Sequence, residues 1–228
     1  MPKAALAFAR GAALLAGTFS GIADMTIRFH RGDLPDLSRY GTSAAIDTET
    51  LGLNPHRDRL CVVQLSPGDG TADVVQIPKG WTDSPNLKRL LADDAVTKIF
   101  HFARFDVAAL YQAFGVVTKP IYCTKIASRL VRTYTDRHGL KDLVRELTGV
   151  DLSKQQQSSD WGADTLTDAQ LAYAASDVLY LHELVAKLDV FLAREGRVEL
   201  AKACFEFLPT RALLDLQGWP DVDIFAHS

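Results

Sequence analysis

The 228-residue sequence has few cysteines, little net charge and no long apolar run. Its three cysteines, Cys61, Cys123 and Cys204, are widely spaced and form no CxxC or similar pattern. We therefore expect neither a disulfide framework nor a zinc site, and a reducing, cytoplasmic location fits best. No run of about 18 apolar residues is present, which excludes a membrane-spanning helix.

The charge balance is close to neutral, with 25 Lys and Arg against 28 Asp and Glu and a formal net charge of −3. This balance argues against a protein that holds long nucleic acid by bulk positive charge. The hydrophobic share of 47% and the charged share of 23% are those of an ordinary globular chain rather than a disordered one. We predict one sizeable folded domain.

The first 24 residues differ from the rest of the chain. They carry Lys3 and Arg10 ahead of a short apolar run at 11–17, a pattern loosely like a signal peptide. Met25 then opens a stretch that already resembles a strand. We expect residues 1–24 to be an extension upstream of a single domain at 25–228, with a cleaved signal segment as the alternative.

From Met25 onward, strand-like and helix-like segments alternate without a linker or an internal repeat. Segments 44–47, 60–65 and 72–77 are apolar and separated by turn residues, which is typical of consecutive antiparallel strands. Further strands are predicted at 98–100 and 116–118, and helices at 86–92, 103–114, 124–131 and 140–147. The pattern predicts an α/β fold, a mixed sheet flanked by helices.

Two boundaries of later helices are marked by local motifs. The segment 167–170, Thr-Asp-Ala-Gln, has the form of a capping box before a long stretch of helical apolar periodicity that reaches Val185. A final helix is predicted from about Arg197 to Leu216, with Gly218 and Pro220 as stop signals.

Asp47 and Glu49 lie at the end of the predicted strand 44–47. Successive strand side chains alternate in direction, so these two carboxylates project to the same side. Magnesium prefers such hard oxygen ligands. Taken alone, the same pattern also describes a solvated polar strand end, the commoner case for charged residues.

Two further elements place acidic side chains on helices. Asp106 lies near the start of the apolar helix 103–114, where it could also serve the helix dipole or a cap. Tyr173 and Asp177 are four residues apart on one helix face. Asp177 has apolar neighbours, and a cation would remove the cost of burying its charge. A partly exposed aspartate beside a core tyrosine is the alternative.

Taken together, the D-x-E at 47–49, the F-D-x-x-x-L at 105–110 and the Y-x-x-x-D at 173–177 resemble the three exonuclease motifs of the DEDD superfamily. The tyrosine is typical of its DEDDy branch. The segments 47–53 and 159–181 look like ribonuclease D in particular. The resemblance covers roughly residues 26 to 216 and implies a ribonuclease H-like mixed sheet flanked by helices.

The resemblance also implies catalytic roles. It makes Asp47, Glu49, Asp106 and Asp177 the ligands of two divalent metal ions, Mg²⁺ or Mn²⁺, with Tyr173 holding the attacking water. Two ions about 3.5–4 Å apart lower the pKa of water and stabilise the attacking and leaving oxygens. Because a tyrosine with a pKa of about 10 is a poor base, we expect Tyr173 to orient the water.

Three residues near the motifs are candidates for substrate contact. By resemblance, Leu53 is an apolar wedge between the last two bases, and a turn leucine covering the core is the alternative. Thr50 is placed near the hydroxyls of the terminal nucleotide. His101 either contacts substrate or caps the local helix.

A polar loop before the predicted helix 140–147 supplies further candidates. A helix N-terminus with basic residues nearby suits a phosphate, and a solvated connector is the alternative. In ribonuclease D-like proteins the same segment closes over the active site. The candidates in this loop are Tyr134, Arg137, His138 and Lys141.

The short length and the C-terminal tail with Trp219 and Phe225 resemble the nano-RNase C group, ring-forming relatives of ribonuclease D that cleave dinucleotides. The resemblance implies a metal-dependent 3′–5′ exoribonuclease that converts very short RNA into nucleoside 5′-monophosphates and acts as a homo-oligomer. One alternative is a broader ribonuclease D-like exonuclease on RNA tails or DNA ends. Others are a proofreading domain for a separate polymerase and a non-catalytic nucleic-acid- or protein-binding module.

Overall fold

The structure is a computed structural model that describes residues 26–81, 83–153 and 155–227. The expected extension at 1–24 lies outside these residues. Within the described part, the strands form one mixed sheet with the order β1-β4-β3-β2-β5-β6. The strands are β1 (Thr26–Arg31), β2 (Ser43–Thr50), β3 (Leu60–Ser66), β4 (Thr71–Gln76), β5 (Thr97–Phe100) and β6 (Ile121–Cys123).

The sheet contains both kinds of pairing. β2, β3 and β4 are antiparallel neighbours, which confirms the prediction for the three segments. β1 pairs with β4 in parallel, and β5 and β6 extend the other edge in parallel. The α/β class and the mixed sheet predicted from the sequence are therefore confirmed.

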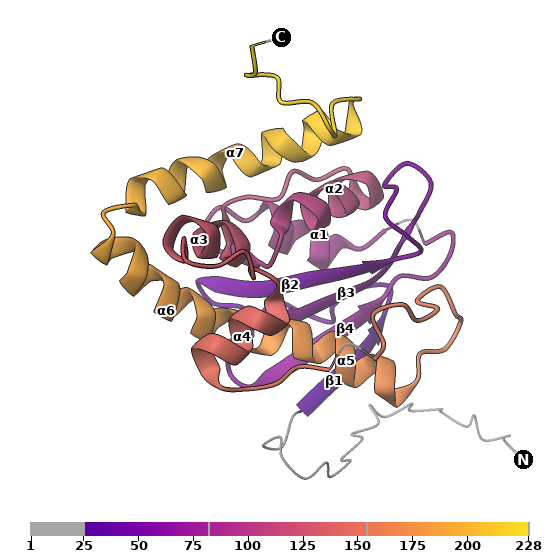
Figure 1. Cartoon of the computed structure of the whole chain (residues 1–228). Coiled ribbons are helices and arrows are strands. Elements are labelled where there is room, and N and C mark those ends of the chain that lie inside the picture. Colours follow the sequence, from indigo (N-terminus) through magenta and orange to yellow (C-terminus); the bar gives the residue numbers. More distant parts are fainter. Residues whose placement is uncertain (1–25, 82, 154, 228) are drawn as a thin grey trace, which may run out of the picture.

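Helices cover both faces of the sheet (Figure 1). On one side lie α1 (Pro85–Ala92), α2 (Ala103–Phe114), α3 (Thr124–Val131) and the long α7 (Val198–Leu216). On the other side α5 (Asp168–Leu179) crosses β2, β3 and β4, and α6 (Leu181–Arg194) packs against α3 and α4 (Leu140–Thr148). No helix in the described ranges is long and apolar enough to cross a membrane.

β3 shows why the central strands are apolar throughout. All of its residues are buried, because the α2 side and the α5 side are both covered. Side chains facing α5 form a small cluster with Trp161, which is 3% exposed. Those facing the other way join the main core. A polar side chain in the middle of this strand therefore needs a partner within the protein.

The pairing of β2 positions the acidic motif. β5 pairs with β2 only over Ser43–Ala45, so the second half of β2 extends beyond its parallel neighbour. The chain leaving β5 enters α2 within a few residues, which brings the first turn of α2 beside this half of β2. Asp47 and Glu49 thus lie where a strand end, α2 and α5 meet.

The structure differs from the sequence predictions at two places. No strand forms at 116–118: Gly115 ends α2 in the left-handed conformation, and pairing with β5 starts only at Ile121, after the cis Lys119–Pro120 bond. The helical stretch after Thr167 is divided at Tyr180 into α5 and α6. The other predicted helices and the capping box are confirmed.

Candidate active site

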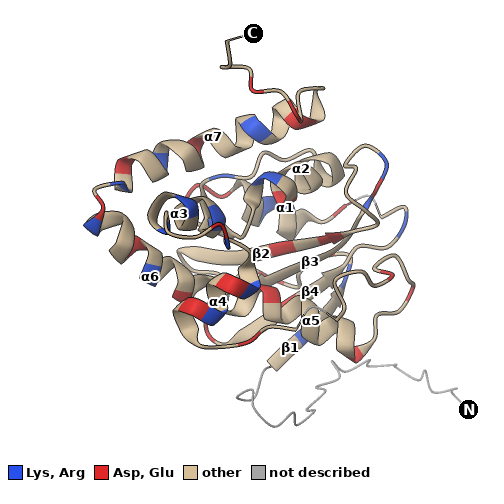
Figure 2. Cartoon of the chain, viewed as in Figure 1, with Lys and Arg blue, Asp and Glu red and all other residues tan. Residues whose placement is uncertain are grey.

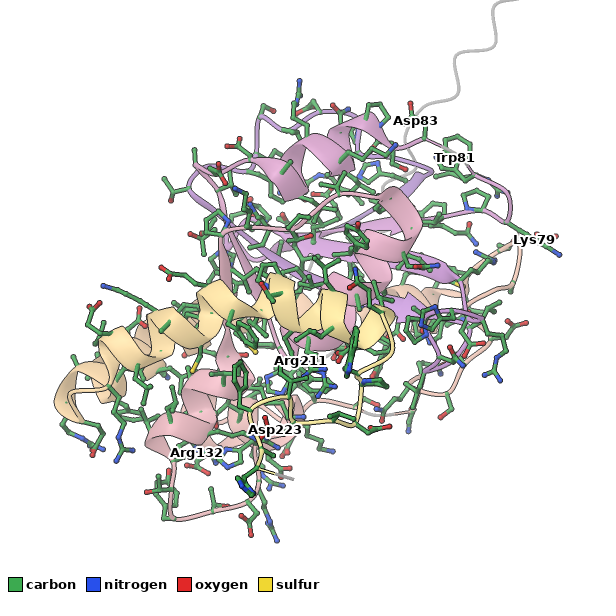
Figure 3. All side chains as sticks on the ribbon, turned by 90° about the horizontal axis from the view of Figure 1, so that it is seen from above. Lys79, Trp81, Asp83, Arg132, Arg211 and Asp223 are labelled. Atoms are coloured by element: carbon green, nitrogen blue, oxygen red, sulfur yellow. The ribbon has the colours of Figure 1, made fainter. Side chains whose placement is uncertain are left out.

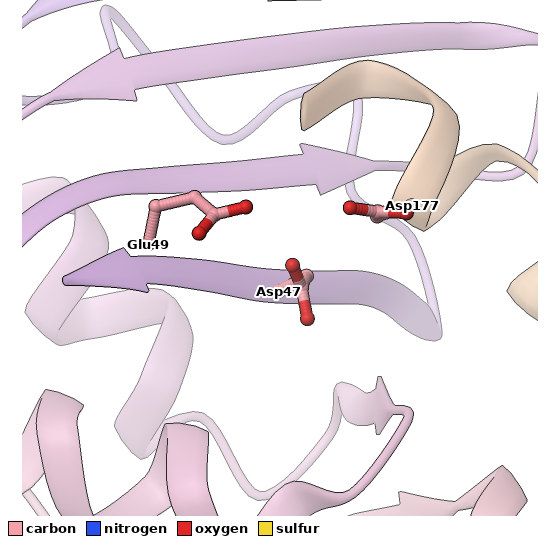
Figure 4. A group of neighbouring side chains, drawn as sticks. All are labelled: Asp47, Glu49 and Asp177. Carbon is pink, nitrogen blue, oxygen red and sulfur yellow. The ribbon is translucent and has the colours of Figure 1, made fainter. Parts of the chain in front are cut away.

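Three carboxylates converge where β2 meets α5 (Figure 4). Asp47 and Glu49 project from the same side of β2, and Asp177 reaches them from α5. One oxygen from each residue lies within 4.8 Å of the others. The structure therefore brings these three predicted residues together as the strand and helix spacings require, while their role as metal ligands stays a prediction.

Burial and mutual repulsion make this group electrostatically unfavourable when all three are charged. Burial raises the pKa of Asp47 to about 7. Burial, together with the charges of Asp47, Asp177 and Asp106, raises the pKa of Glu49 to about 9. The pKa of Asp177 is also raised well above its usual range, by burial and by Asp47. A cation among these oxygens would remove both costs.

Asp106 lies beside this group rather than within it. It is 3% exposed in the first turn of α2, and its Oδ1 accepts a 2.7 Å hydrogen bond from Thr48 Oγ1. Burial and the charge of Asp47 raise its pKa well above the usual range. Asp106 is therefore within electrostatic reach of the group, although the set of mutually close oxygens does not include it.

Tyr173 lies one helical turn before Asp177, as predicted. Its ring is half-buried against Trp161, with ring centroids 6.0 Å apart. Burial and the nearby charges of Asp177, Glu49 and Asp47 raise the pKa of the phenol. Tyr173 therefore stays protonated and can donate a hydrogen bond beside the carboxylates.

The structure adds two residues that sequence reasoning missed. Gln64 of β3 donates a 2.6 Å hydrogen bond from Nε2 to Asp47 Oδ2, and Thr48 binds Asp106 from the other face of β2. The only sequence signal for Gln64 was a lone polar residue within the apolar run 60–65. For Thr48 the signal was its place between the two acids of the D-x-E motif.

The three residues predicted to contact substrate near the motifs differ in their surroundings. Leu53 is 84% exposed in the turn after β2. Thr50 donates a hydrogen bond to the Gly52 carbonyl in the same turn. His101 Nδ1 lies 2.9 Å from Thr124 Oγ1, and burial lowers the pKa of His101 to about 3, so its ring is neutral. Phe102, not His101, is the N-cap residue of α2, and the ring of His101 bonds Thr124 at the start of α3.

The predicted phosphate loop lies between α3 and α4. Tyr134 and Arg137 line a cavity of about 440 Å³. The lining of this cavity includes none of the motif carboxylates. His138 Nδ1 lies 2.9 Å from Ser128 Oγ, and Lys141 is in the first turn of α4.

One exposed aromatic beside the motif residues was also missed. Phe102 precedes α2 with φ +70°, the one non-glycine residue of the described ranges in the left-handed region. Its ring is 44% exposed, and Lys125 Nζ lies 4.1 Å from the ring centroid. Charged residues of both signs are spread along the helices of the chain (Figure 2).

Comparison with known proteins identifies the family. The model of the 3′–5′ exonuclease family matches residues 36–193. The chain belongs to the 3′–5′ exonuclease family, as the motif resemblance predicted. Among solved structures, it is similar to Brucella melitensis NrnC with bound Mg²⁺, with 64% identity, a TM-score of 0.86, and coverage of 89% of this chain and 99% of that one.

Two further comparisons place the chain within the ribonuclease D-like group. NrnC from the same organism bound to pGG is 65% identical with a TM-score of 0.87, covering 90% of this chain and 100% of that chain. Ribonuclease D of Acidiphilium cryptum is 37% identical over 154 residues, which are 68% of this chain and 39% of that protein. The chain thus spans about two-fifths of the length of the ribonuclease D relatives that it matches.

Proposed function

We propose that this protein is a 3′–5′ exoribonuclease that hydrolyses dinucleotides and other very short RNA to nucleoside 5′-monophosphates with two divalent metal ions. The observation that carries the proposal is the convergence of Asp47, Glu49 and Asp177 in a half-buried group whose carboxyl pKa values are raised. The similarity to an NrnC bound to pGG supports the dinucleotide as substrate.

The carboxylates of this chain fit Mg²⁺ or Mn²⁺, which take hard oxygen ligands. Asp47, Glu49 and Asp177 would hold one ion, and Asp106 together with Asp47 would hold the second. When bound, the ions lower the pKa of water and stabilise the attacking and leaving oxygens of the displacement. The NrnC relative with bound Mg²⁺ supports this metal.

The side chains around the carboxylates position the reactants. The protonated phenol of Tyr173 orients the attacking water by hydrogen bonding, since its raised pKa makes it a poor base. The water loses a proton as its oxygen forms the new bond to phosphorus, the bond from phosphorus to the 3′ oxygen of the preceding nucleotide breaks, and that oxygen takes up a proton, so that one water is consumed overall. The product is a nucleoside 5′-monophosphate.

Substrate binding is proposed on both sides of the carboxylates. Leu53, 84% exposed beside the end of β2, is available as the wedge between the two bases. Thr50 and His101 would contact the terminal nucleotide, His101 as a neutral ring. The loop residues Tyr134, Arg137, His138 and Lys141 would contact phosphate.

A time course with labelled 2-mer, 3-mer, 7-mer and 20-mer substrates, each as RNA and as DNA, tests the proposal. We expect the RNA 2-mer to be cleaved fastest in Mg²⁺. Comparable single-turnover rates on 2-mers and 20-mers would instead support the broader exonuclease, which the similarity to ribonuclease D favours. The Asp47→Asn variant is the control, and unchanged hydrolysis would point to a contaminant and to a non-catalytic binding module.

We also propose that the protein forms a homo-oligomer, arranged as a ring. The support is a set of exposed apolar side chains in the C-terminal tail, which include Trp219, at 43% exposure, and Phe225, at 76%. Arg211 of α7 and Asp223 of the tail line one cavity and lie on the same side of α7 (Figure 3). Light scattering of the wild type and of Phe225→Ser tests this, and a monomeric wild type would contradict it.

A further inference from the structure

Gln64 is a polar residue in the middle of a fully buried strand. Its side chain is 0% exposed, and its neighbours along β3 include Val63 and Leu65, which belong to the main core. Burying an amide without a partner is costly, so a glutamine here needs a contact inside the protein. The contact it makes is with the central carboxylate of the candidate active site.

The register of the sheet places Gln64 directly opposite Asp47. Paired residues in an antiparallel ladder project to the same face, so the amide and the carboxylate lie side by side. The distance from Nε2 to Asp47 Oδ2 is 2.6 Å. A carboxylate that is ionised only accepts hydrogen bonds, so the amide must present its NH₂ group to Asp47.

The other end of the same amide is unusual. Gln64 Oε1 is buried and has no hydrogen-bond partner within the described residues. The Gln64 amide thus keeps the hydrogen bond from its NH₂ group to Asp47, although its oxygen has no partner. The contact with Asp47 therefore determines how the amide is oriented. A leucine or methionine would fill the same space without an unpartnered oxygen.

We propose that Gln64 is a positioning residue for metal binding: its amide fixes the plane of the Asp47 carboxylate, so that the oxygens of Asp47, Glu49 and Asp177 are arranged before a cation arrives. This inference rests on the proposed role of Asp47 as a metal ligand. Groups that hydrogen-bond to metal ligands orient them, and their loss typically weakens metal affinity by about 10–100-fold.

The same sheet contains a matched control. Gln76 of β4 is 4% exposed, donates a 2.8 Å hydrogen bond from Nε2 to the Ala163 carbonyl, and likewise has a buried Oε1 without a partner in the described chain. It differs from Gln64 in bonding a loop carbonyl instead of a site carboxylate. A merely structural role would make the two residues equivalent.

The experiment compares Gln64→Met and Gln76→Met in the full chain after removal of metal with a chelator. Binding of Mn²⁺ is measured by electron paramagnetic resonance and calorimetry, without substrate, and thermal melting checks the fold. We expect Gln64→Met to weaken Mn²⁺ binding by roughly 10–100-fold, and Gln76→Met to leave it unchanged. Equal effects of the two substitutions, or unchanged binding in Gln64→Met, would overturn the proposal.

Two further measurements keep the result interpretable. If Gln64→Met does not fold, Gln64→Asn keeps an amide in the strand but shortens it out of reach of Asp47. In an Asp47→Ala background, Gln64→Met should have no further effect on Mn²⁺ affinity, and a persisting effect would refute action through Asp47. Binding of Mn²⁺ is measured without substrate, so it is tested separately from RNA hydrolysis. A wild type that binds Mn²⁺ but does not cleave RNA would refute the proposed function and leave the role of Gln64 in metal binding standing.

Discussion

At the scale of single residues, the protein brings several half-buried acidic groups together where β2 meets α5. The pKa of Glu49 is raised to about 9 by burial and then by its carboxylate neighbours. The fold therefore holds a group of charges that would be more stable in solvent. Such an arrangement costs folding free energy and is compensated when a cation binds.

The raised pKa values predict how stability depends on pH in the absence of metal. As the pH rises from the ordinary carboxyl range near 4, the unfolded chain loses these protons before the folded chain does. The folded state binds more protons, so its stability falls as the pH approaches about 7 for Asp47 and about 9 for Glu49. Mg²⁺ should therefore raise the Tm more at about pH 8 than at about pH 6.

Thermal melts in chelator and in Mg²⁺ across this range provide the measurement. The Glu49→Gln variant is the control, because it removes one of the raised groups and should flatten the fall in Tm without metal. A wild type whose metal-free Tm does not fall over the same range would contradict the raised pKa values of these carboxyls.

Tyr173→Phe should lower kcat and leave metal binding intact. The phenol stays protonated beside the carboxylates, so its contribution is a hydrogen bond to the attacking water. A hydrogen bond to a neutral group contributes about 0.5–1.5 kcal/mol, which corresponds to roughly a 2- to 13-fold loss of kcat. Single-turnover kinetics and Mn²⁺ titration measure the two effects separately, and a normal rate would remove this role from Tyr173.

The sequence allowed some residues of the site to be predicted and not others. Asp47 with Glu49, and Tyr173 with Asp177, follow from the periods of one strand and one helix, so their shared directions are local properties. The contact of Gln64 with Asp47 depends on the register between β2 and β3. The register is set by the packing of the whole sheet and by the turn between the strands. A short sequence motif contains neither of these.

At the scale of elements, local signals decided which predictions were confirmed. The capping box at Thr167 and Gln170 correctly marked the start of α5, because both reciprocal hydrogen bonds lie within four residues. The break at Tyr180 was missed because apolar periodicity continues through it. The strand at 116–118 was wrong because pairing with β5 starts only beyond the cis Lys119–Pro120 bond.

Thr167→Ala should reduce the free energy of unfolding by about 1 kcal/mol, since the Thr167 side chain accepts from the Gln170 amide at the first turn of α5. Urea denaturation of the metal-free protein measures this loss. Thr165→Ala, an exposed position two residues earlier, is the control and should leave stability nearly unchanged. Equal stability of the two variants would mean that the capping box contributes nothing measurable.

At the scale of the whole molecule, the net charge of −3 bears on how much nucleic acid the protein can hold. Part of this negative charge belongs to Asp47, Glu49, Asp106 and Asp177, which the proposed ions would offset. Lysines and arginines are spread over several helices among acidic residues (Figure 2). The charge distribution therefore favours a compact site for a few nucleotides over a long basic groove.

The salt dependence of binding follows from this distribution. For single strands, the logarithm of affinity falls with the logarithm of salt concentration with a slope of about −0.7 per phosphate contacted. A ligand held by one or two phosphates should therefore give a slope between about −0.7 and −1.4, whatever the length of RNA offered. Fluorescence titration of labelled 2-mer and 20-mer RNA into Asp47→Asn, the variant expected to be inactive, measures both slopes at fixed Mg²⁺. A markedly steeper slope for the 20-mer, together with tighter binding, would show that the protein contacts further phosphates along its surface. That result would contradict the proposed specificity for dinucleotides.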